Sequence, residues 1–382
     1  MKKHFLFTPG PTPIPPEALL AMAAPIDYHR SAEAVVIIKD VLAKLKHVFQ
    51  TRNDVLLLTS SGTGAMEGAL ANLFSYKDRV IVIRSGKFGE RWGEICSAYG
   101  IEFEPIDLEW GDSVHPQAVA DLLDKRPDTK AVLSTLCETS TGALHDVQQL
   151  AQITRDRPTL LFVDAVSALG ADDLQMDNWG IDVVVSCSQK GLMTPPGLGF
   201  AALNNRAWET VEQANLPRFY FDFRKARDAG LKGSTPYTPA ITFIIALQHA
   251  LNRICSEGIR NVITRHARLA EATRSAAKAI GLELLASNPA NTLTSIRLPE
   301  KIDGKAFVEM MRKKHGVTYA GGQEKLSGKI IRIAHLGWMC EHDVIIAISA
   351  LERGLAEIGY DVPLGAGVTA AQETLIKGHP TQ

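Results

Sequence analysis

Short apolar runs alternate with segments of helical pattern over the first half of the chain. Five runs are almost uniformly apolar and rich in β-branched residues, at 55–58, 80–83, 131–134, 160–163 and 183–185. Three intervening segments have the spacing of helices, at 65–74, 90–99 and 147–155. Strands without polar alternation are typical of a parallel sheet that helices cover on both faces. The pattern therefore predicts an open α/β core.

The pattern after residue 240 is that of a smaller α+β domain. Its expected elements are a helical stretch at 241–280 with a break near Gly258, β-like runs at 295–298 and 330–334, and a helix ending near Gly354. At the other end, prolines at 9, 11, 13, 15 and 16 predict an extended arm, since each ring removes an amide donor and restricts its predecessor.

These patterns suggest a division into three parts. We expect an N-terminal arm at 1–18, a large domain at 19–240 and a small C-terminal domain at 241–382. The tail after Pro363 is richer in Gly, Ala, Thr and Gln and is expected to be partly mobile.

Composition narrows the class of protein. The 382 residues are 46% hydrophobic and 22% charged, which suits a globular protein with a substantial core. Lys and Arg total 41 and Asp and Glu total 42, a net charge of −1, so no basic excess favours nucleic acid. We expect no nucleic-acid partner.

The cysteines and the apolar segments bear on location. Five scattered cysteines without a CxxC pair indicate free thiols in a reducing compartment and no metal site. No apolar run is long enough to span a bilayer, and the N-terminus lacks a signal-peptide core. We therefore expect a soluble, cytoplasmic protein without a membrane partner.

Three segments carry candidate chemistry. Small residues at 59–67 follow a strand and precede a helix, so backbone amides at a positive helix terminus could hold a phosphate; an ordinary strand-to-helix turn has the same composition. Asp164 ends an apolar strand, where open α/β sheets place ligand-binding groups, although a helix cap fits equally well. Lys190 lies between a strand and a Pro-Pro-Gly turn, and taken alone would be a surface lysine.

Together the three features suit one cofactor. Pyridoxal 5'-phosphate needs amides for its phosphate, a carboxylate for its ring nitrogen and a lysine for its aldehyde. Lys190 follows Asp164 by 26 residues, and both follow the phosphate-binding turn.

At this point the sequence resembles the class V aminotransferases of the alanine–glyoxylate, serine–glyoxylate and serine–pyruvate group, within the fold type I pyridoxal-phosphate enzymes. The resemblance covers nearly the whole chain. The matching segments are, in order, 9–12, 61–67, 86–91, 138–142, 163–170, 188–190 with 195–197, 238–239 and 331–337. It implies a large domain with a mostly parallel seven-stranded sheet and a smaller α+β domain.

The resemblance also implies roles for residues. Lys190 would form the Schiff base with the cofactor and Asp164 would pair with its ring nitrogen. The other cofactor contacts would be Ser61, Gly62, Thr63 and Gln189 at the phosphate, Phe88 and Val166 on the two ring faces, Thr139 near the phenolic oxygen, and Thr238 from a neighbouring subunit. Arg332 would bind the substrate carboxylate, assisted by Gly10, in a homodimer with shared active sites. Tyr237 and Arg30 have no assigned role.

The implied activity is transamination from a small L-amino acid, serine or alanine and also aspartate, to a 2-oxo acid, glyoxylate or pyruvate. The tail at 364–372 resembles that of glyoxylate-using enzymes. Two alternatives remain. One is another class V reaction such as a lyase, although the stretch 317–332 lacks the cysteine that a desulfurase needs. The other is a non-catalytic subunit of a larger complex, because some chains with this pattern are labelled soluble-hydrogenase subunits.

Overall fold

A seven-stranded sheet forms the centre of the larger part of the molecule. The computed structural model describes residues 3–26 and 28–377. The strand order is β2 (Val55–Ser60), β10 (Gly197–Leu203), β9 (Val183–Cys187), β8 (Leu160–Asp164), β5 (Ala131–Thr135), β3 (Arg79–Arg84) and β4 (Glu102–Asp107). All neighbours are parallel except β10, which is antiparallel to both β2 and β9. The predicted α/β class, with a mostly parallel sheet, is confirmed.

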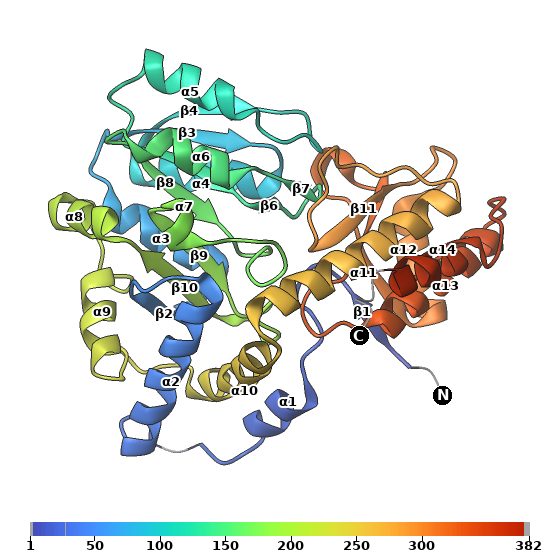
Figure 1. Cartoon of the computed structure of the whole chain (residues 1–382), viewed down its shortest axis with the longest axis horizontal. Helices are drawn as coiled ribbons and strands as arrows, with labels where there is room; N and C mark the ends of the chain where they lie inside the picture. Colours follow the sequence, from blue (N-terminus) through green and yellow to red (C-terminus); the bar gives the residue numbers. More distant parts are fainter. Residues whose placement is uncertain (1–2, 27, 378–382) are drawn as a thin grey trace.

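Helices cover both faces of this sheet (Figure 1). Because side chains alternate along a strand, Leu56 and Leu58 belong to one hydrophobic core, and Val55 and Leu57 belong to the core on the other face. The first core is closed by α3 (Gly62–Leu73), α4 (Lys87–Tyr99) and α8 (Asn205–Gln213). The second is closed by α2 (Ala32–Phe49), α5 (Pro116–Lys125), α6 (Val147–Arg155), α7 (Met176–Trp179) and α10 (Ile241–Glu257).

A second, four-stranded sheet has the order β1 (Phe5–Phe7), β12 (Val317–Gly321), β13 (Ile330–Ala334) and β11 (Leu293–Arg297). Its β1 strand, from the proline-rich arm, runs parallel to β12. The helical elements beside it are α11 (Ile259–Ala279), α12 (Gly304–Met310), the π-helical turn η1 (Met311–His315), α13 (Glu341–Glu357) and α14 (Ala366–Lys377). The division at residues 18 and 240 stays a prediction; α10 contacts α1 (Pro16–Met22) and α2, whereas α11 contacts α14.

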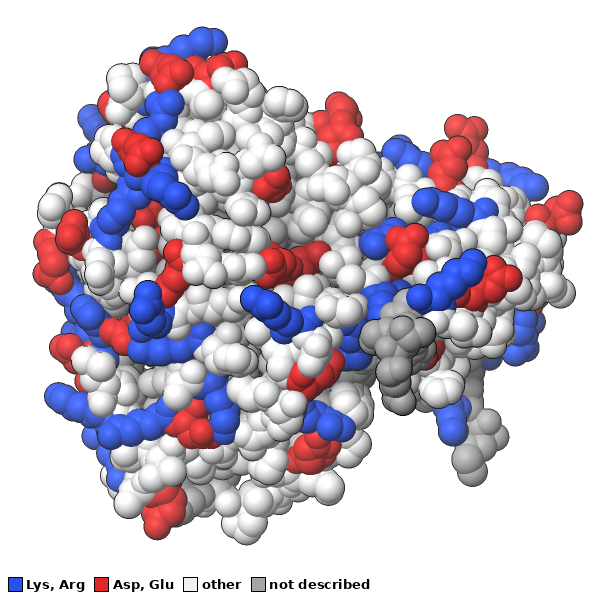
Figure 2. Space-filling view, in the orientation of Figure 1, with Lys and Arg blue, Asp and Glu red and all other residues white. Residues whose placement is uncertain are grey.

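Smaller elements complete the chain. They are the hairpin of β6 (Cys137–Glu138) and β7 (Ala143–Leu144), the helix α9 (Phe223–Leu231) and the 3₁₀ turn η2 (Glu324–Leu326). On the face shown in Figure 2, positive and negative side chains are interspersed rather than gathered by sign. Within the described residues, no helix is both long and apolar enough to cross a membrane.

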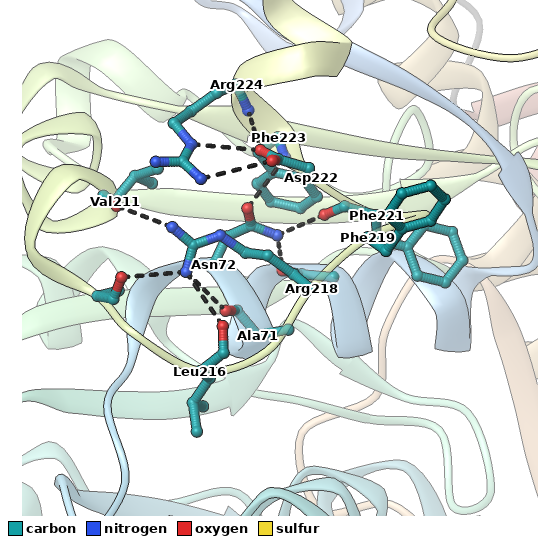
Figure 3. Close-up of polar contacts among 12 residues, drawn as sticks. Ala71, Asn72, Val211, Leu216, Arg218, Phe219, Phe221, Asp222, Phe223 and Arg224 are labelled. Atoms are coloured by element: carbon teal, nitrogen blue, oxygen red, sulfur yellow. Dashed lines mark hydrogen bonds and ion pairs between the residues drawn. The ribbon is translucent and has the colours of Figure 1, made fainter.

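Polar side chains tie the segment after α8 to the C-terminal end of α3 (Figure 3). Arg218 donates to main-chain carbonyls near the C-terminal ends of two helices. Among them are the carbonyl of Ala71 in α3 and that of Val211 in α8, each 3.4 Å away. The buried amide of Asn72 donates to the Phe221 carbonyl at 2.5 Å and accepts from the Phe223 amide at 2.9 Å. These contacts satisfy carbonyls that a helix end leaves without partners.

The C-terminal tail is more ordered than its composition predicts. We expected partial mobility after Pro363, but Ala366–Lys377 form α14, which packs on α11 and α13. The buried carboxylate of Glu352, on α13, accepts hydrogen bonds from the amides of Gly365 and Gly367, each at 2.7 Å, and of Val368 at 3.1 Å. A side chain from another helix thus supplies the cap that the tail lacks in its own sequence. Residues 378–382 lie outside the described part.

We expect Glu352→Ala to release α14, because three backbone amides lose a charged acceptor, at a cost of about 2 to 4 kcal/mol. Hydrogen-exchange mass spectrometry should show faster exchange over residues 366–377. The matched control is Glu373→Gln, whose carboxylate is exposed on α14 beside Lys377. Equal protection of α14 in Glu352→Ala and the control would show that the cap is unimportant.

Candidate active site

The predicted site residues meet at one edge of the large sheet. The carboxyl ends of β2, β3, β5, β8 and β9 all lie at that edge, because these strands are parallel in direction. Asp164 ends β8, Lys190 follows β9, and Gly62 begins α3 directly after β2. Ligands bind at this edge in open α/β folds. The topology therefore brings together residues separated by more than a hundred positions.

Lys190 is held by the N-terminal arm. Its Nζ donates to the Pro9 carbonyl at 2.6 Å, and the Thr12 hydroxyl donates to the Lys190 carbonyl at 3.0 Å. Gly10, with φ of 140°, presses against the lysine stem, since a Cβ there would lie 2.4 Å from Lys190 carbons. Burial lowers the pKa of Lys190, and the positive charge of Arg332 acts in the same direction. The side chain is thus a partly dehydrated amine and not a solvated surface lysine.

Asp164 is buried and accepts a hydrogen bond from the Val166 amide at 2.7 Å. Burial raises its pKa to about 7, opposed by that hydrogen bond and raised further by the negative charge of Glu138. Val166 also touches the start of α3, because a Cβ on Gly62 would lie 2.6 Å from Val166 Cγ2. A carboxyl group with this pKa becomes ionised readily when a cation binds beside it.

The turn before α3 has the properties of an anion site. Ser61 is the N-cap but makes no side-chain cap hydrogen bond, and the first turn of a helix has amides without intrahelical partners. Arg91, from α4, donates to the Thr63 hydroxyl at 3.3 Å, which places a positive charge beside this turn. The helix-terminal amides and the arginine fit a phosphate. The buried side-chain oxygen of Gln189 has no partner among the described residues, but it is an acceptor, so only the NH2 group of this side chain could donate to a phosphate.

Two further predicted residues follow β6 and begin α4. Thr139 is buried after β6, and its hydroxyl shares a 2.6 Å hydrogen bond with Ser167, three residues after Asp164. Phe88 is half-buried in the first turn of α4, and the guanidinium of Arg91 lies 4.9 Å from the centre of its ring. Sequence reasoning assigned no role to Ser167 or Arg91, although they lie in the matching segments 163–170 and 86–91.

Arg332 is buried on β13, where the sequence left open an exposed face or a cleft. Its Nε and one terminal nitrogen donate to the Gly321 carbonyl at 3.0 and 2.8 Å. The other terminal nitrogen donates to the Thr139 carbonyl at 2.8 Å. Burial lowers the pKa of Arg332 to about 10, while the negative charge of Glu138 opposes the change. The guanidinium is therefore positively charged, fixed in orientation and joined to both β12 and the turn after β6.

Three residues singled out in the sequence lie elsewhere in this chain. Thr238 is exposed and lines a hollow beside β2 together with Tyr237. The Tyr237 ring stacks on Tyr220 and its hydroxyl donates to the Phe219 carbonyl at 3.1 Å. Arg30 donates to the His29 ring at 3.3 Å in the turn before α2.

Sequence reasoning missed Glu138. This carboxylate is fully buried beside the site and accepts hydrogen bonds from the amides of Phe88, Gly89 and Ser140. Its signal in the sequence was a charged residue a few positions after an apolar strand, next to Thr139 in the matching segment 138–142. Within residues 3–26 and 28–377, no group of three or more His, Cys, Asp or Glu side chains is arranged to hold a metal ion.

The arrangement fits the cofactor that the resemblance implies. A partly dehydrated amine, a buried carboxyl group, a helix-terminal anion site and an aromatic ring lie on adjacent loops of one sheet edge. These are the groups that an aldehyde, a pyridine nitrogen, a phosphate and an aromatic ring would need. The buried arginine adds a site for a substrate carboxylate.

Comparison with known proteins leads to the same family. Residues 4–335 match the family model described as aminotransferase class-V. The serine–glyoxylate aminotransferase of Hyphomicrobium methylovorum is 37% identical, over 97% of this chain and 94% of its own length. A chain from Synechococcus sp. named soluble hydrogenase, small subunit, is 42% identical over 98% of both chains.

The solved structures agree in fold. The pyridoxamine–pyruvate aminotransferase of Mesorhizobium loti superposes with a TM-score of 0.94, at 26% identity, over 99% of this chain and 98% of its own. The sheet order, the site and the match over most of the chain lead to one conclusion. The chain belongs to the class V aminotransferases, fold type I enzymes whose cofactor is pyridoxal phosphate.

Proposed function

We propose that this protein transfers the amino group of a small L-amino acid, serine or alanine and also aspartate, to glyoxylate or pyruvate. The observation that carries the proposal is the convergence of Lys190 and Asp164, at the edge of the large sheet, with Arg332 of β13, whose charges act on one another. The named serine–glyoxylate relative, similar over nearly the whole chain, supports the substrate class.

Lys190 is the proposed proton carrier. Pyridoxal phosphate, when bound, withdraws electrons from the substrate Cα and so makes its proton acidic. Burial lowers the pKa of Lys190, so its amine loses its own proton more readily than that of a solvated lysine, and the neutral amine can take the Cα proton on Nζ and return it. The Pro9 carbonyl, 2.6 Å from Nζ, orients the amine. Asp164, once ionised, would keep the ring nitrogen of the cofactor protonated.

Arg332 is the proposed carboxylate ligand. A guanidinium has five N–H groups, of which Gly321 and Thr139 carbonyls take three. One N–H on each terminal nitrogen remains for a bidentate carboxylate. All the candidate amino and oxo acids carry that carboxylate, so Arg332 binds each of them without selecting among their side chains.

The active unit is proposed to be a cytoplasmic homodimer. Thr238 is exposed and Tyr237 is half-buried, and both line a hollow whose lining does not include Lys190, which suits a contribution to the site of a second copy. Phe219 and Tyr220, beside them, are exposed aromatic side chains that such a contact would cover. All five thiols are free, as expected in a reducing compartment.

A non-catalytic subunit is the second candidate, because a relative at 42% identity carries a hydrogenase-subunit name. A scaffold needs neither a dehydrated lysine nor a buried arginine. A desulfurase-type lyase is a weaker candidate, since residues 317–332 contain no cysteine and the exposed Cys340 is the N-cap of α13.

The first test is the absorbance spectrum of the purified protein with pyridoxal phosphate during separate additions of L-serine, L-alanine and L-aspartate, without an oxo acid. We expect the yellow band to convert to the pyridoxamine-phosphate band, fastest with the preferred donor. Lys190→Ala should slow this conversion by roughly 10³-fold or more, whereas Lys313→Ala, which removes an exposed ion-paired lysine of η1, should keep the rate. No band shift with any donor would refute transamination.

Arg332→Gln should raise KM for amino and oxo acids alike by roughly 30-fold to 800-fold. The reason is that a charge-assisted bidentate contact worth about 2 to 4 kcal/mol is lost. Steady-state kinetics with each substrate varied in turn measures this. Arg297→Gln, an exposed arginine on the neighbouring strand β11, is the matched control. Unchanged KM values in Arg332→Gln would place the carboxylate elsewhere.

Asp164 should make the stability of the cofactor-free protein depend on pH. Its pKa is about 7 when folded and near 3.8 when unfolded, so the folded state holds the extra proton and loses stability as pH rises from about 4 to 7, by a few kcal/mol. The free energy of unfolding, measured with urea at pH 5 and at pH 7.5, should fall less between the two pH values in Asp164→Asn than in the unmodified protein.

The control for this prediction is Asp172, which is also buried with a pKa raised to about 7. Pyridoxal phosphate should reduce the Asp164 contribution, since a ring cation favours the ionised carboxylate, and leave the Asp172 contribution unchanged. Equal effects of the cofactor on Asp164→Asn and Asp172→Asn would contradict the pairing of Asp164 with the ring.

A further inference from the structure

Glu138 is a buried carboxylate with four hydrogen-bond donors. It accepts from the amides of Phe88 at 3.1 Å, Gly89 at 2.9 Å and Ser140 at 3.0 Å, and from the Ser140 hydroxyl at 2.6 Å. The side chain has no exposed surface. A carboxylate surrounded by donors is stabilised in its ionised form, although burial raises the pKa of Glu138.

These contacts cap α4 from outside the helix. The first amides of a helix have no intrahelical partner, and Gly86, the N-cap of α4, has no side chain to supply one. Glu138 satisfies the amides of Phe88 and Gly89, and the Ser140 hydroxyl accepts from the Lys87 amide at 3.0 Å. Gly86 is required at the N-cap because a Cβ there would lie 2.6 Å from Glu138 Cδ.

The capped turn belongs to the cofactor site. Phe88 lies in this turn, and Arg91, one turn later, contacts the Phe88 ring and donates to Thr63 at the anion site. Thr139, adjacent to Glu138, bonds to Ser167 and accepts from Arg332. Glu138 thus lies where the aromatic side of the site and the substrate-carboxylate side meet.

We propose that Glu138 is a positioning residue that fixes the first turn of α4 and thereby aims the Phe88 ring at the bound cofactor. It acts through the Phe88 and Gly89 amides and does not contact the cofactor. The inference rests on the proposed position of Phe88 against the cofactor ring. A neutral amide cannot replace the carboxylate, because one of its two polar atoms is a donor facing backbone donors.

The first experiment uses the cofactor-free protein with the substitution Glu138→Gln. Hydrogen-exchange mass spectrometry should show at least tenfold faster exchange over residues 87–91, because two cap hydrogen bonds are lost. The matched control is Glu67→Gln on α3. It removes a carboxylate that accepts a 2.7 Å hydrogen bond from Tyr99, at the other end of α4. It should leave residues 87–91 protected. Unchanged exchange in Glu138→Gln overturns the proposal.

The second experiment measures cofactor binding as a double-mutant cycle. Glu138→Gln and Phe88→Ala should each weaken the Kd for pyridoxal phosphate by about tenfold or more and reduce the visible circular dichroism of the bound cofactor. The double variant should be no weaker than Phe88→Ala alone, because the glutamate acts through the ring. Additive losses of affinity would mean that Glu138 acts independently of Phe88 and would overturn the proposal.

A third variant covers the case in which Glu138→Gln does not fold. Ser140→Ala removes one donor to Glu138 and the acceptor for the Lys87 amide, so it should give a smaller shift in the same direction in both experiments. Its lack of any effect on exchange and on Kd would overturn the proposal. Failure of the unmodified protein to bind pyridoxal phosphate would instead refute the proposed function, while the exchange experiment still tests the cap.

Discussion

The site depends on burying an amine, a guanidinium and two carboxyl groups together. Lys190 and Asp164 lie at the edge of the large sheet, Glu138 ends β6, and Arg332 comes from β13 of the smaller sheet. Burying any one of these charges alone, away from water, would cost free energy, and the neighbouring charges change that cost. The negative charge of Glu138 favours the charged form of Arg332 and disfavours that of Asp164, while Arg332 lowers the pKa of Lys190. A change in the charge of one group is therefore expected to shift the pKa of its neighbours.

The N-terminal arm connects this set to the smaller sheet. Phe5–Phe7 pair with β12, and a few residues later Pro9 and Thr12 bond to Lys190. Strand β12 ends at Gly321, whose carbonyl orients Arg332. The pair of β1 and β12 therefore connects the segment that contacts Lys190 with the segment that contacts Arg332. A shift of the smaller sheet would move both side chains at once. The prolines that predicted an extended arm serve this purpose, because an extended chain can reach from one sheet to the other.

The sequence revealed those features whose signal is local. Apolar runs predicted five of the seven strands of the large sheet, and the strand ends indicated Asp164 and Lys190. Strand β10 escaped notice because its start, Gly197–Leu198–Gly199, has no β-branched residue, and β4 because an exposed edge strand needs few apolar side chains. Glu138, Glu352 and the order of α14 depend on contacts between distant segments, which a single sequence does not display. The roles of Thr238, Phe88 and Val166 came from resemblance and stay predictions.

The cost of these buried charges bears on the choice between an enzyme and a scaffold. Replacing a buried ionic group by an apolar side chain of similar size is commonly neutral or stabilising. A chain with only a structural role would be more stable with an apolar residue at Lys190 or Arg332, provided that the cavity stayed filled. Both side chains are instead oriented by main-chain carbonyls, with two N–H groups of Arg332 left for a ligand. Such an arrangement sacrifices stability for preorganised binding, which is the property that separates an active site from a core.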